Sequence, residues 1–301
     1  MKPEELFAVP PLPRKHDARR TLDVDNAEAV ARHIEAGGIR NLLYGGNAFL
    51  YHATQDDFET MVGWLAQMPA ARVPIPSIGP SFGRALDQAR LLARHRFAAA
   101  MMLPCGDPRD PAGLEAGYRE IAQAAGIPLI IYLKSEDAFG PDKASGLEAI
   151  GRLVESGVAA AVKYAVVLPD PKSDSYLGAL LWRVDKASVI SGMGERPAIA
   201  HLQHFHLGGM TTGSGCVAPR TCKAFFDSCR RADWGTAEEL RSAFMPLEDL
   251  RDAWGPARVL HQATELANIA RTGPIPPYVS PLTEAQVKRL APVARALRER
   301  D

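Results

Sequence analysis

The chain has 301 residues, of which 47% are hydrophobic and 23% charged, a globular composition that excludes a largely disordered chain. Lys and Arg together number 35, as do Asp and Glu, so the zero net charge does not favour a nucleic-acid or membrane-surface partner. Apolar runs fall short of the ~20 residues of a membrane span, and the N-terminal MKPEELFAVPPLPRKHD lacks a secretory-signal pattern. Four cysteines without a CxxC pair do not make a disulfide scaffold. We expect a cytoplasmic protein with no membrane and no nucleic acid among its partners.

Short apolar segments recur along the first two thirds of the chain. They are almost continuously apolar rather than alternating, which is typical of strands buried on both faces of a parallel sheet. The expected strands are Leu6–Val9, Ile39–Tyr44, Val73–Ile78, Phe97–Leu103, Ile127–Tyr132, Val158–Lys163, Ala187–Ser191 and Gly208–Gly213. Because most of the second to sixth strands start about 25–35 residues apart, the length of one strand–helix unit, they predict an α/β fold, the (β/α)8 TIM barrel.

Amphipathic segments fill the gaps between the strands and predict helices. The expected barrel helices are Asn26–Ala36, Asp56–Gln67, Gly83–His95, Gly113–Ala125 and Lys143–Ser156, the last with Asp142 as a candidate N-cap. After Pro219 the strand signal stops, and four more helices are expected at Thr221–Ala232, Thr236–Trp254, Pro256–Arg271 and Thr283–Arg300. We therefore predict a barrel domain over residues 1–220 and a C-terminal helical extension over residues 221–301.

Lys163 is the most informative residue in this pattern. Functional groups of such barrels lie at the carboxyl ends of the strands, and Lys163 ends the apolar run Val158–Lys163. A lysine held among apolar groups has a lowered pKa, and its neutral amine can attack a carbonyl carbon. The alternative is that Lys163 only emerges at a strand end and extends into water.

Other strand ends carry further candidates. Tyr132 ends the neighbouring strand, where a phenol can transfer protons beside the amine or simply pack at the barrel rim. The turn Gly45–Asn47 presents paired glycines whose N–H groups can approach a carboxylate, although any tight turn can use such a pair. The segment Gly192–Glu195 and Ser214 follow the last two expected strands.

Three histidines in HLQHFH (residues 201–206) raise the alternative of a metal hydrolase. Their spacing does not place all three on one helical face, and no acidic residue stands among them. We therefore expect a partly exposed helix surface here rather than a zinc site.

Together, these strand ends resemble the dihydrodipicolinate synthase and N-acetylneuraminate lyase family, which are class I aldolases and lyases. The resemblance extends from about residue 7 to residue 297. GGNAFLYHAT (45–54) stands where the family has a motif like GGTGEFYSLT, IPLIIY (127–132) is similar to the strand with the catalytic tyrosine, and GVAAAVK (157–163) to the strand with the Schiff-base lysine. SGMGE (191–195) and residues 208–219 resemble the next substrate-lining turn and the eighth strand.

The resemblance implies a specific chemistry. Lys163 would form an imine with a 2-oxo acid such as pyruvate, and Tyr132 would relay protons. Gly45, Gly46 and Asn47 would hold the carboxylate of the oxo acid. Gly192, Glu195 and Ser214 would line the substrate site, with an aldehyde as a second substrate in some reactions. The resemblance implies no metal and no organic cofactor. It also implies a homotetramer that is built as a dimer of dimers.

Several departures bear on the substrate. Asn47 stands where many synthases have a threonine of a proton relay, and residues 103–107 offer no second relay tyrosine. Residues 133–140 contain no arginine to clamp a second carboxylate, so only Lys134 is left to substitute. We therefore expect a sugar-acid or hydroxy-oxo-acid aldolase or dehydratase rather than an efficient dihydrodipicolinate synthase. The alternative is a barrel that binds 2-oxo acids without catalysis.

Overall fold

The chain forms a closed barrel of parallel strands. The structure, a computed structural model, describes residue 2 and residues 4–301. Within these residues eight strands pair in chain order, and β1 closes the barrel by pairing with both β2 and β8. The strands are β1 (Leu6–Ala8), β2 (Asn41–Tyr44), β3 (Val73–Ile78), β4 (Ala100–Met102), β5 (Leu129–Leu133), β6 (Ala159–Tyr164), β7 (Val189–Ser191) and β8 (Gly209–Thr212). The predicted (β/α)8 barrel is confirmed, and each predicted strand overlaps an observed one.

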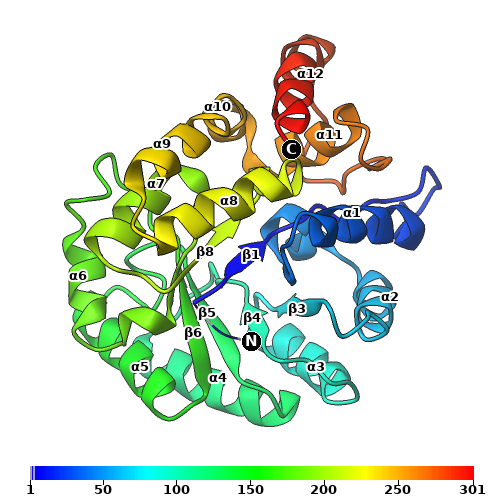
Figure 1. The fold of residues 1–301 in the computed structure, drawn as a ribbon. Coiled ribbons are helices and arrows are strands. Elements are labelled where there is room, and N and C mark those ends of the chain that lie inside the picture. Colours follow the sequence, from blue (N-terminus) through cyan, green and yellow to red (C-terminus); the bar gives the residue numbers. More distant parts are fainter. Residues whose placement is uncertain (1, 3) are drawn as a thin grey trace.

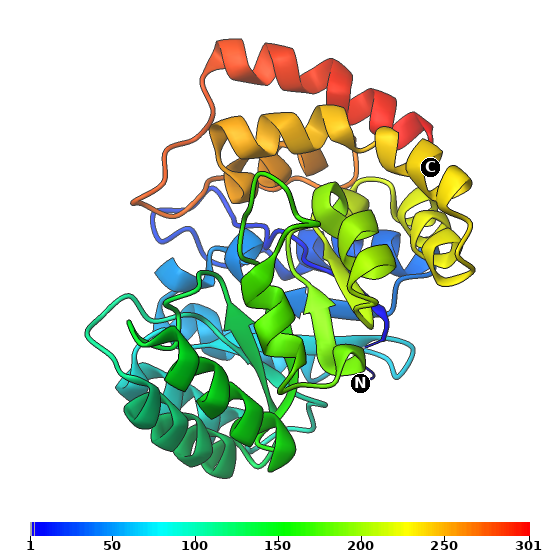
Figure 2. The same ribbon diagram turned by 90° about the vertical axis from the view of Figure 1, so that its left-hand side faces the viewer.

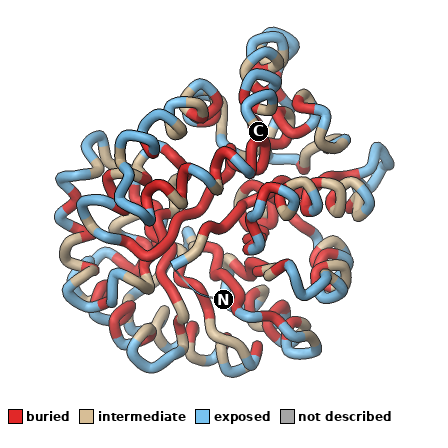
Figure 3. Tube along the Cα trace, viewed as in Figure 1, coloured by how far each residue is buried: buried red, intermediate tan, exposed pale blue. Residues whose placement is uncertain are grey.

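Helices surround this barrel and continue beyond it (Figure 1). They are α1 (Val24–Ala36), α2 (Gln55–Leu65), α3 (Phe82–Leu92), α4 (Pro111–Ala125), α5 (Lys143–Glu155), α6 (Ser175–Leu181), α7 (Glu195–Ile199), α8 (Pro219–Arg230), α9 (Trp234–Ser242), α10 (Met245–Trp254), α11 (Pro256–Leu266) and α12 (Glu284–Glu299). Figure 3 shows that the strands are buried almost throughout, whereas exposure is concentrated on the outer helices.

Helix ends follow local signals in the sequence. Asp142 caps α5, as predicted, by accepting a hydrogen bond from the N–H of Ser145 at 3.1 Å. Gly126 ends α4 in the left-handed region with φ +67°, a conformation that glycine adopts without steric cost. No helix in the part of the chain described here is long and apolar enough to cross a bilayer.

One predicted helix is wrong in the structure. The expected single helix Thr236–Trp254 is two helices, α9 and α10, which are separated at Ala243–Phe244. Pro246 explains the break, because proline donates no backbone hydrogen bond and its ring clashes with the carbonyl four residues earlier. It is tolerated in the first turn of a new helix, where it lies in α10.

The last helices lie together on one side of the barrel. Figure 2 shows α12 running across α10 and α11, and α11 also packs against the 3₁₀ turn that follows β2. The C-terminal Asp301 side chain accepts hydrogen bonds from the N–H groups of Arg220 at 2.6 Å and Thr221 at 3.4 Å. The end of the chain is thereby fixed to the start of α8. The division into residues 1–220 and 221–301 remains a prediction.

The entry into β8 gives a test of the barrel packing. A Cβ added at Gly208 would lie 2.3 Å from the carbonyl oxygen of Ala187, a backbone atom that cannot move cheaply. We expect Gly208→Ala to lower the free energy of unfolding by about 1–3 kcal/mol, measured by denaturant titration. Gly63→Ala, inside α2 with nothing within 4 Å of the new Cβ, is the control and should gain about 0.5–1 kcal/mol. Equal stability of the two variants would contradict the packing.

Candidate active site

A cavity opens at the carboxyl ends of the barrel strands. It has a volume of about 350 Å³ and is lined by residues at the ends of β1, β2, β5, β6, β7 and β8. The helical extension supplies its other wall, from α10, from the first turn of α11 and from Val279 in the loop before α12. Because barrels of this kind carry function at this face, the cavity is the candidate active site.

The sequence-predicted residues divide into two groups in relation to this cavity. Gly46, Asn47, Tyr132, Lys163 and Gly192 line it. The other three predicted residues, Gly45, Glu195 and Ser214, lie outside the lining.

Tyr132 and Lys163 are direct neighbours across the β5–β6 pairing. They are register partners, as expected for the ends of adjacent strands. The Lys163 Nζ lies 4.1 Å from the centre of the Tyr132 ring. The amine and the phenol therefore belong to one small region of the cavity.

The Lys163 amine is held away from water. Lys163 is only 5% exposed to solvent. Burial lowers the pKa of Lys163 to about 7, with further lowering from the positive charges of Lys134 and Arg251. A substantial fraction of the amine is therefore neutral near pH 7 and has a free lone pair.

The turn after β2 combines a packed glycine with an open one. A Cβ at Gly45 would lie 2.9 Å from the Cε of Met101, so Gly45 serves close packing. A Cβ at Gly46 would meet nothing within 4 Å, in keeping with its place on the cavity wall. Asn47 donates its amide to the carbonyl of Val9 at 2.8 Å, which joins the turn to the end of β1.

Tyr51 is a cavity residue that sequence reasoning missed. It lies in the 3₁₀ turn Leu50–His52, and Arg84 of α3 holds this turn by donating to the Ala53 carbonyl at 2.5 Å and to two carbonyls before it. Burial first, and the charge of Tyr132 second, raise the pKa of Tyr51, so the two phenols are close neighbours. The sequence feature that could have predicted Tyr51 as a site residue is an aromatic residue in the turn that follows an expected strand. The site therefore has a second tyrosine, from the turn after β2 instead of from residues 103–107.

The turn after β7 packs against the end of β6 through its backbone. The N–H of Gly192 donates to the carbonyl of Tyr164 at 2.6 Å, and a Cβ at Gly192 would lie 2.5 Å from that oxygen. Only glycine allows this approach. Gly192 thus lines the cavity through its main chain.

Glu195 does not face the substrate cavity, contrary to the sequence-based expectation. It is fully buried, and one carboxylate oxygen accepts hydrogen bonds from Thr212 and from Cys222. Burial and the nearby Glu248 carboxylate raise the pKa of Glu195 above its usual value. Glu195 begins α7 and is not among the residues that line the cavity.

Ser214 is expected to line the substrate site, but a buried ion pair from α10, Glu248–Arg251, lines the cavity at this position. Ser214 donates to Glu248, which also accepts from Arg251, and both ion-pair residues line the cavity. A Cβ at Gly213 would lie 2.3 Å from the Arg251 guanidinium. No local pattern in the sequence predicts this pair, because the contact joins the end of β8 to a helix more than thirty residues later.

The histidine segment is a partly exposed helical turn, as expected, with His204 exposed and His201 buried. His201 is 1% exposed and lies in a turn of π-helix, Ala200–His204, where its Nδ1 is 2.8 Å from the Ser191 hydroxyl. Burial lowers its pKa to about 4. No group of three or more His, Cys, Asp or Glu among the described residues is arranged to hold a metal ion.

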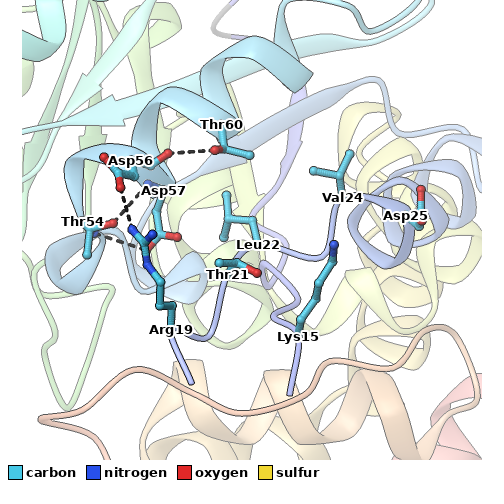
Figure 4. A pocket seen from close by; sticks show the side chains of 10 residues that line it. All are labelled: Lys15, Arg19, Thr21, Leu22, Val24, Asp25, Thr54, Asp56, Asp57 and Thr60. Atoms are coloured by element: carbon cyan, nitrogen blue, oxygen red, sulfur yellow. Dashed lines mark hydrogen bonds and ion pairs between the residues drawn. The ribbon is translucent and has the colours of Figure 1, made fainter. Parts of the chain in front are cut away.

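A second cavity lies between the N-terminal loop and α2 (Figure 4). Two of its three acidic side chains are already engaged: Asp56 pairs with Arg19 at 2.7 Å and Asp57 with Arg14 at 2.9 Å, and Asp25 is the third. It lies apart from the strand-end residues that the sequence singled out. The cavity at the barrel mouth remains the candidate active site.

Comparisons with known proteins agree with this architecture. No protein-family model matches the sequence. The chain is 25% identical to a 4-hydroxy-tetrahydrodipicolinate synthase of Afipia carboxidovorans, over 74% of each chain. It is 26% identical to a probable 5-dehydro-4-deoxyglucarate dehydratase of Streptomyces avermitilis, over 91% of this chain and 87% of that protein.

Solved structures show the same fold. A dihydrodipicolinate synthase from Oceanobacillus iheyensis superposes with a TM-score of 0.84 at 19% identity, covering 99% of this chain and 97% of that one. The N-acetylneuraminate lyase of Proteus mirabilis superposes with a TM-score of 0.80 at 16% identity, covering 99% of both chains. With the curated relatives, this likeness supports the resemblance to the dihydrodipicolinate synthase and N-acetylneuraminate lyase family that the sequence indicated.

Proposed function

We propose that the protein is a lyase that forms a Schiff base between Lys163 and pyruvate or another 2-oxo acid. The observation that carries this proposal is the buried Lys163 amine, whose pKa is lowered to about 7 beside the Tyr132 phenol. The curated relatives are a synthase and a probable dehydratase, which supports catalysis over the alternative of a non-catalytic 2-oxo-acid-binding barrel.

The chemistry begins at the neutral amine. Lys163 Nζ attacks the ketone carbon of the oxo acid to give a carbinolamine, and loss of water from it gives an iminium ion. Burial raises the pKa of Tyr132 to about 12, so at neutral pH the phenol holds a proton that it donates to the departing hydroxyl group. The resulting phenolate is then a base for the proton on the neighbouring carbon.

The iminium lowers the barrier of the later bond-breaking steps. It withdraws the electron pair released when a carbon–carbon bond, a carbon–oxygen bond or a carbon–hydrogen bond next to it breaks. The protein's own lysine thus acts as the electron sink, and the proposed reaction requires neither a metal nor an organic cofactor.

The carboxylate of the oxo acid has a natural place in the turn after β2. Gly46 and Asn47 lie in the first turn of a 3₁₀ segment, where N–H groups have no partner within the turn. We infer that these N–H groups form the binding site for the carboxylate of the oxo acid, as the resemblance implies. We also propose that the protein works in the cytoplasm as a homotetramer, and that an aldehyde is its second substrate or its product.

Borohydride trapping tests the covalent step. In the presence of pyruvate or another accepted 2-oxo acid, reduction should add the mass of the reduced adduct to the protein, and peptide mapping should place it at Lys163. Lys163→Met should abolish the adduct and leave the fold intact, because it replaces a buried amine by an apolar group of similar length. Lys186→Met, at an exposed lysine, is the control and should retain the adduct. An adduct at a different lysine would overturn the assignment.

The role of Tyr132 is tested by removing only its hydroxyl group. Tyr132→Phe should keep part of the imine formation but slow turnover by about 10²–10⁴-fold, the usual contribution of a positioned proton-transfer group. Steady-state turnover and adduct formation are compared in the same variant. Undiminished turnover would reduce Tyr132 to a packing residue.

The pH dependence of imine formation follows from the lowered pKa of Lys163. Below pH 7 the amine is mostly protonated and cannot attack, so the rate of trapping should rise with pH through a midpoint near 7. An ordinary lysine would give a midpoint near 10.4. Lys134→Met removes a positive charge that lowers the pKa, so the midpoint should move to higher pH. A midpoint of 10 in the parent protein would contradict the desolvated amine.

A further inference from the structure

The positively charged side chains that line the barrel-mouth cavity outnumber the negatively charged ones. Its two carboxylates both have cationic partners: Glu248 is paired with Arg251, and Asp252 lies 2.9 Å from the guanidinium of Arg196. No carboxylate in the cavity lining of the described chain is left without a cation. The acidic groups there are already neutralised.

Two cations of the same cavity are not neutralised. Lys134 and Arg258 line it, and neither forms an ion pair with a carboxylate of the described residues. The Arg258 Nη2 donates to the carbonyl of Pro281 at 2.6 Å, which fixes the guanidinium, while its Nε is buried without a hydrogen-bond partner. A buried guanidinium nitrogen without an acceptor is costly, which favours an anionic acceptor from outside the chain.

The backbone around Arg258 adds to this positive region. Arg258 lies in the first turn of α11, an 11-residue helix with no acidic side chain in that turn. The first N–H groups of a helix are unpaired and carry partial positive charge. Gly255, Pro256 and Ala257 of the same turn also line the cavity.

We propose that the cavity selects a 2-oxo acid that carries a second acid group at its far end, and that Arg258, with Lys134, binds that group. This inference rests on the proposed function, since it assigns the substrate class of the same site. The first carboxylate belongs to the oxo-acid end at Gly46 and Asn47, so a substrate with one carboxylate leaves Arg258 and Lys134 without a counter-ion. The guanidinium comes from α11 and not from residues 133–140, which contain no arginine.

The test compares two 2-oxo acids of equal chain length, 2-oxoglutarate and 2-oxopentanoate, in borohydride trapping at Lys163. The parent protein should reach half-saturation at a concentration at least about tenfold lower for the diacid, because a hydrogen bond to a charged group strengthens binding by about 10- to 100-fold. Arg258→Met should raise the half-saturating concentration for 2-oxoglutarate by about that factor and leave 2-oxopentanoate within about threefold. Arg258→Lys should fall between the two, because a point charge copies the guanidinium fork incompletely.

Arg289→Met is the matched control. Arg289 lies in the same helical extension over the ring of Trp254 at 5.1 Å and does not line the cavity, so its loss should not change the preference for the diacid. Equal half-saturation of both acids in the parent protein, or an equal loss for both in Arg258→Met, would overturn the inference.

Glutarate, which has no ketone, separates this inference from the proposed function. Its binding, measured by calorimetry, should weaken in Arg258→Met by about the same factor as the trapping. Absence of an adduct with every 2-oxo acid, together with Arg258-dependent glutarate binding, would overturn the Schiff-base proposal and support the anion site. Adducts with both oxo acids and no effect of Arg258 on either ligand would do the opposite.

Discussion

The desolvation of the Lys163 amine is the constraint on which the rest of the site depends. A primary amine loses much of its affinity for a proton when it is moved from water into an apolar barrel. The two charges that act on it most, Lys134 and Arg251, are positive, so nothing near it restores the protonated form. The closed strand ring supplies the dry surroundings, and the ring of Tyr132 covers one side of the amine. A lysine amine that is partly neutral near pH 7 is thus a consequence of where β6 ends.

The helical extension completes the site instead of merely following the barrel. The Glu248–Arg251 pair of α10 sits against the ends of β7 and β8, where Gly194 and Gly213 leave room for it. A Cβ at Gly213 would collide with the guanidinium, so a small residue and a large cation fit together across two parts of the chain. The pair fills space above the barrel and brings a positive charge close to Lys163 without leaving a free carboxylate to bind its proton.

The fold followed from the sequence more fully than the site did. Continuous apolar runs located all eight strands, because burial on both faces leaves a strong local pattern. The break before α10 was missed, although Pro246 marks it, because the apolar spacing on both sides is helical. For the site, strand ends predicted Lys163 and Tyr132, which line the cavity, and also Glu195, which does not, since position along the chain does not tell which way a side chain turns. Tyr51, Arg251 and Arg258 reach the cavity through loop and helix packing that local patterns do not encode.

Positive charge in the cavity serves the proposed reaction at two stages. Before substrate enters, the charges of Lys134 and Arg251 help keep the Lys163 amine neutral. An entering dianion neutralises that charge and brings its own carboxylates close to the reacting nitrogen. The iminium that then forms is cationic, so it is stabilised by the same carboxylates once the surrounding positive charge is cancelled. Lys134 takes part in both stages, because its charge favours the neutral amine in the empty site and binds the second acid group in the filled one. A substrate with a single carboxylate gains only part of this effect.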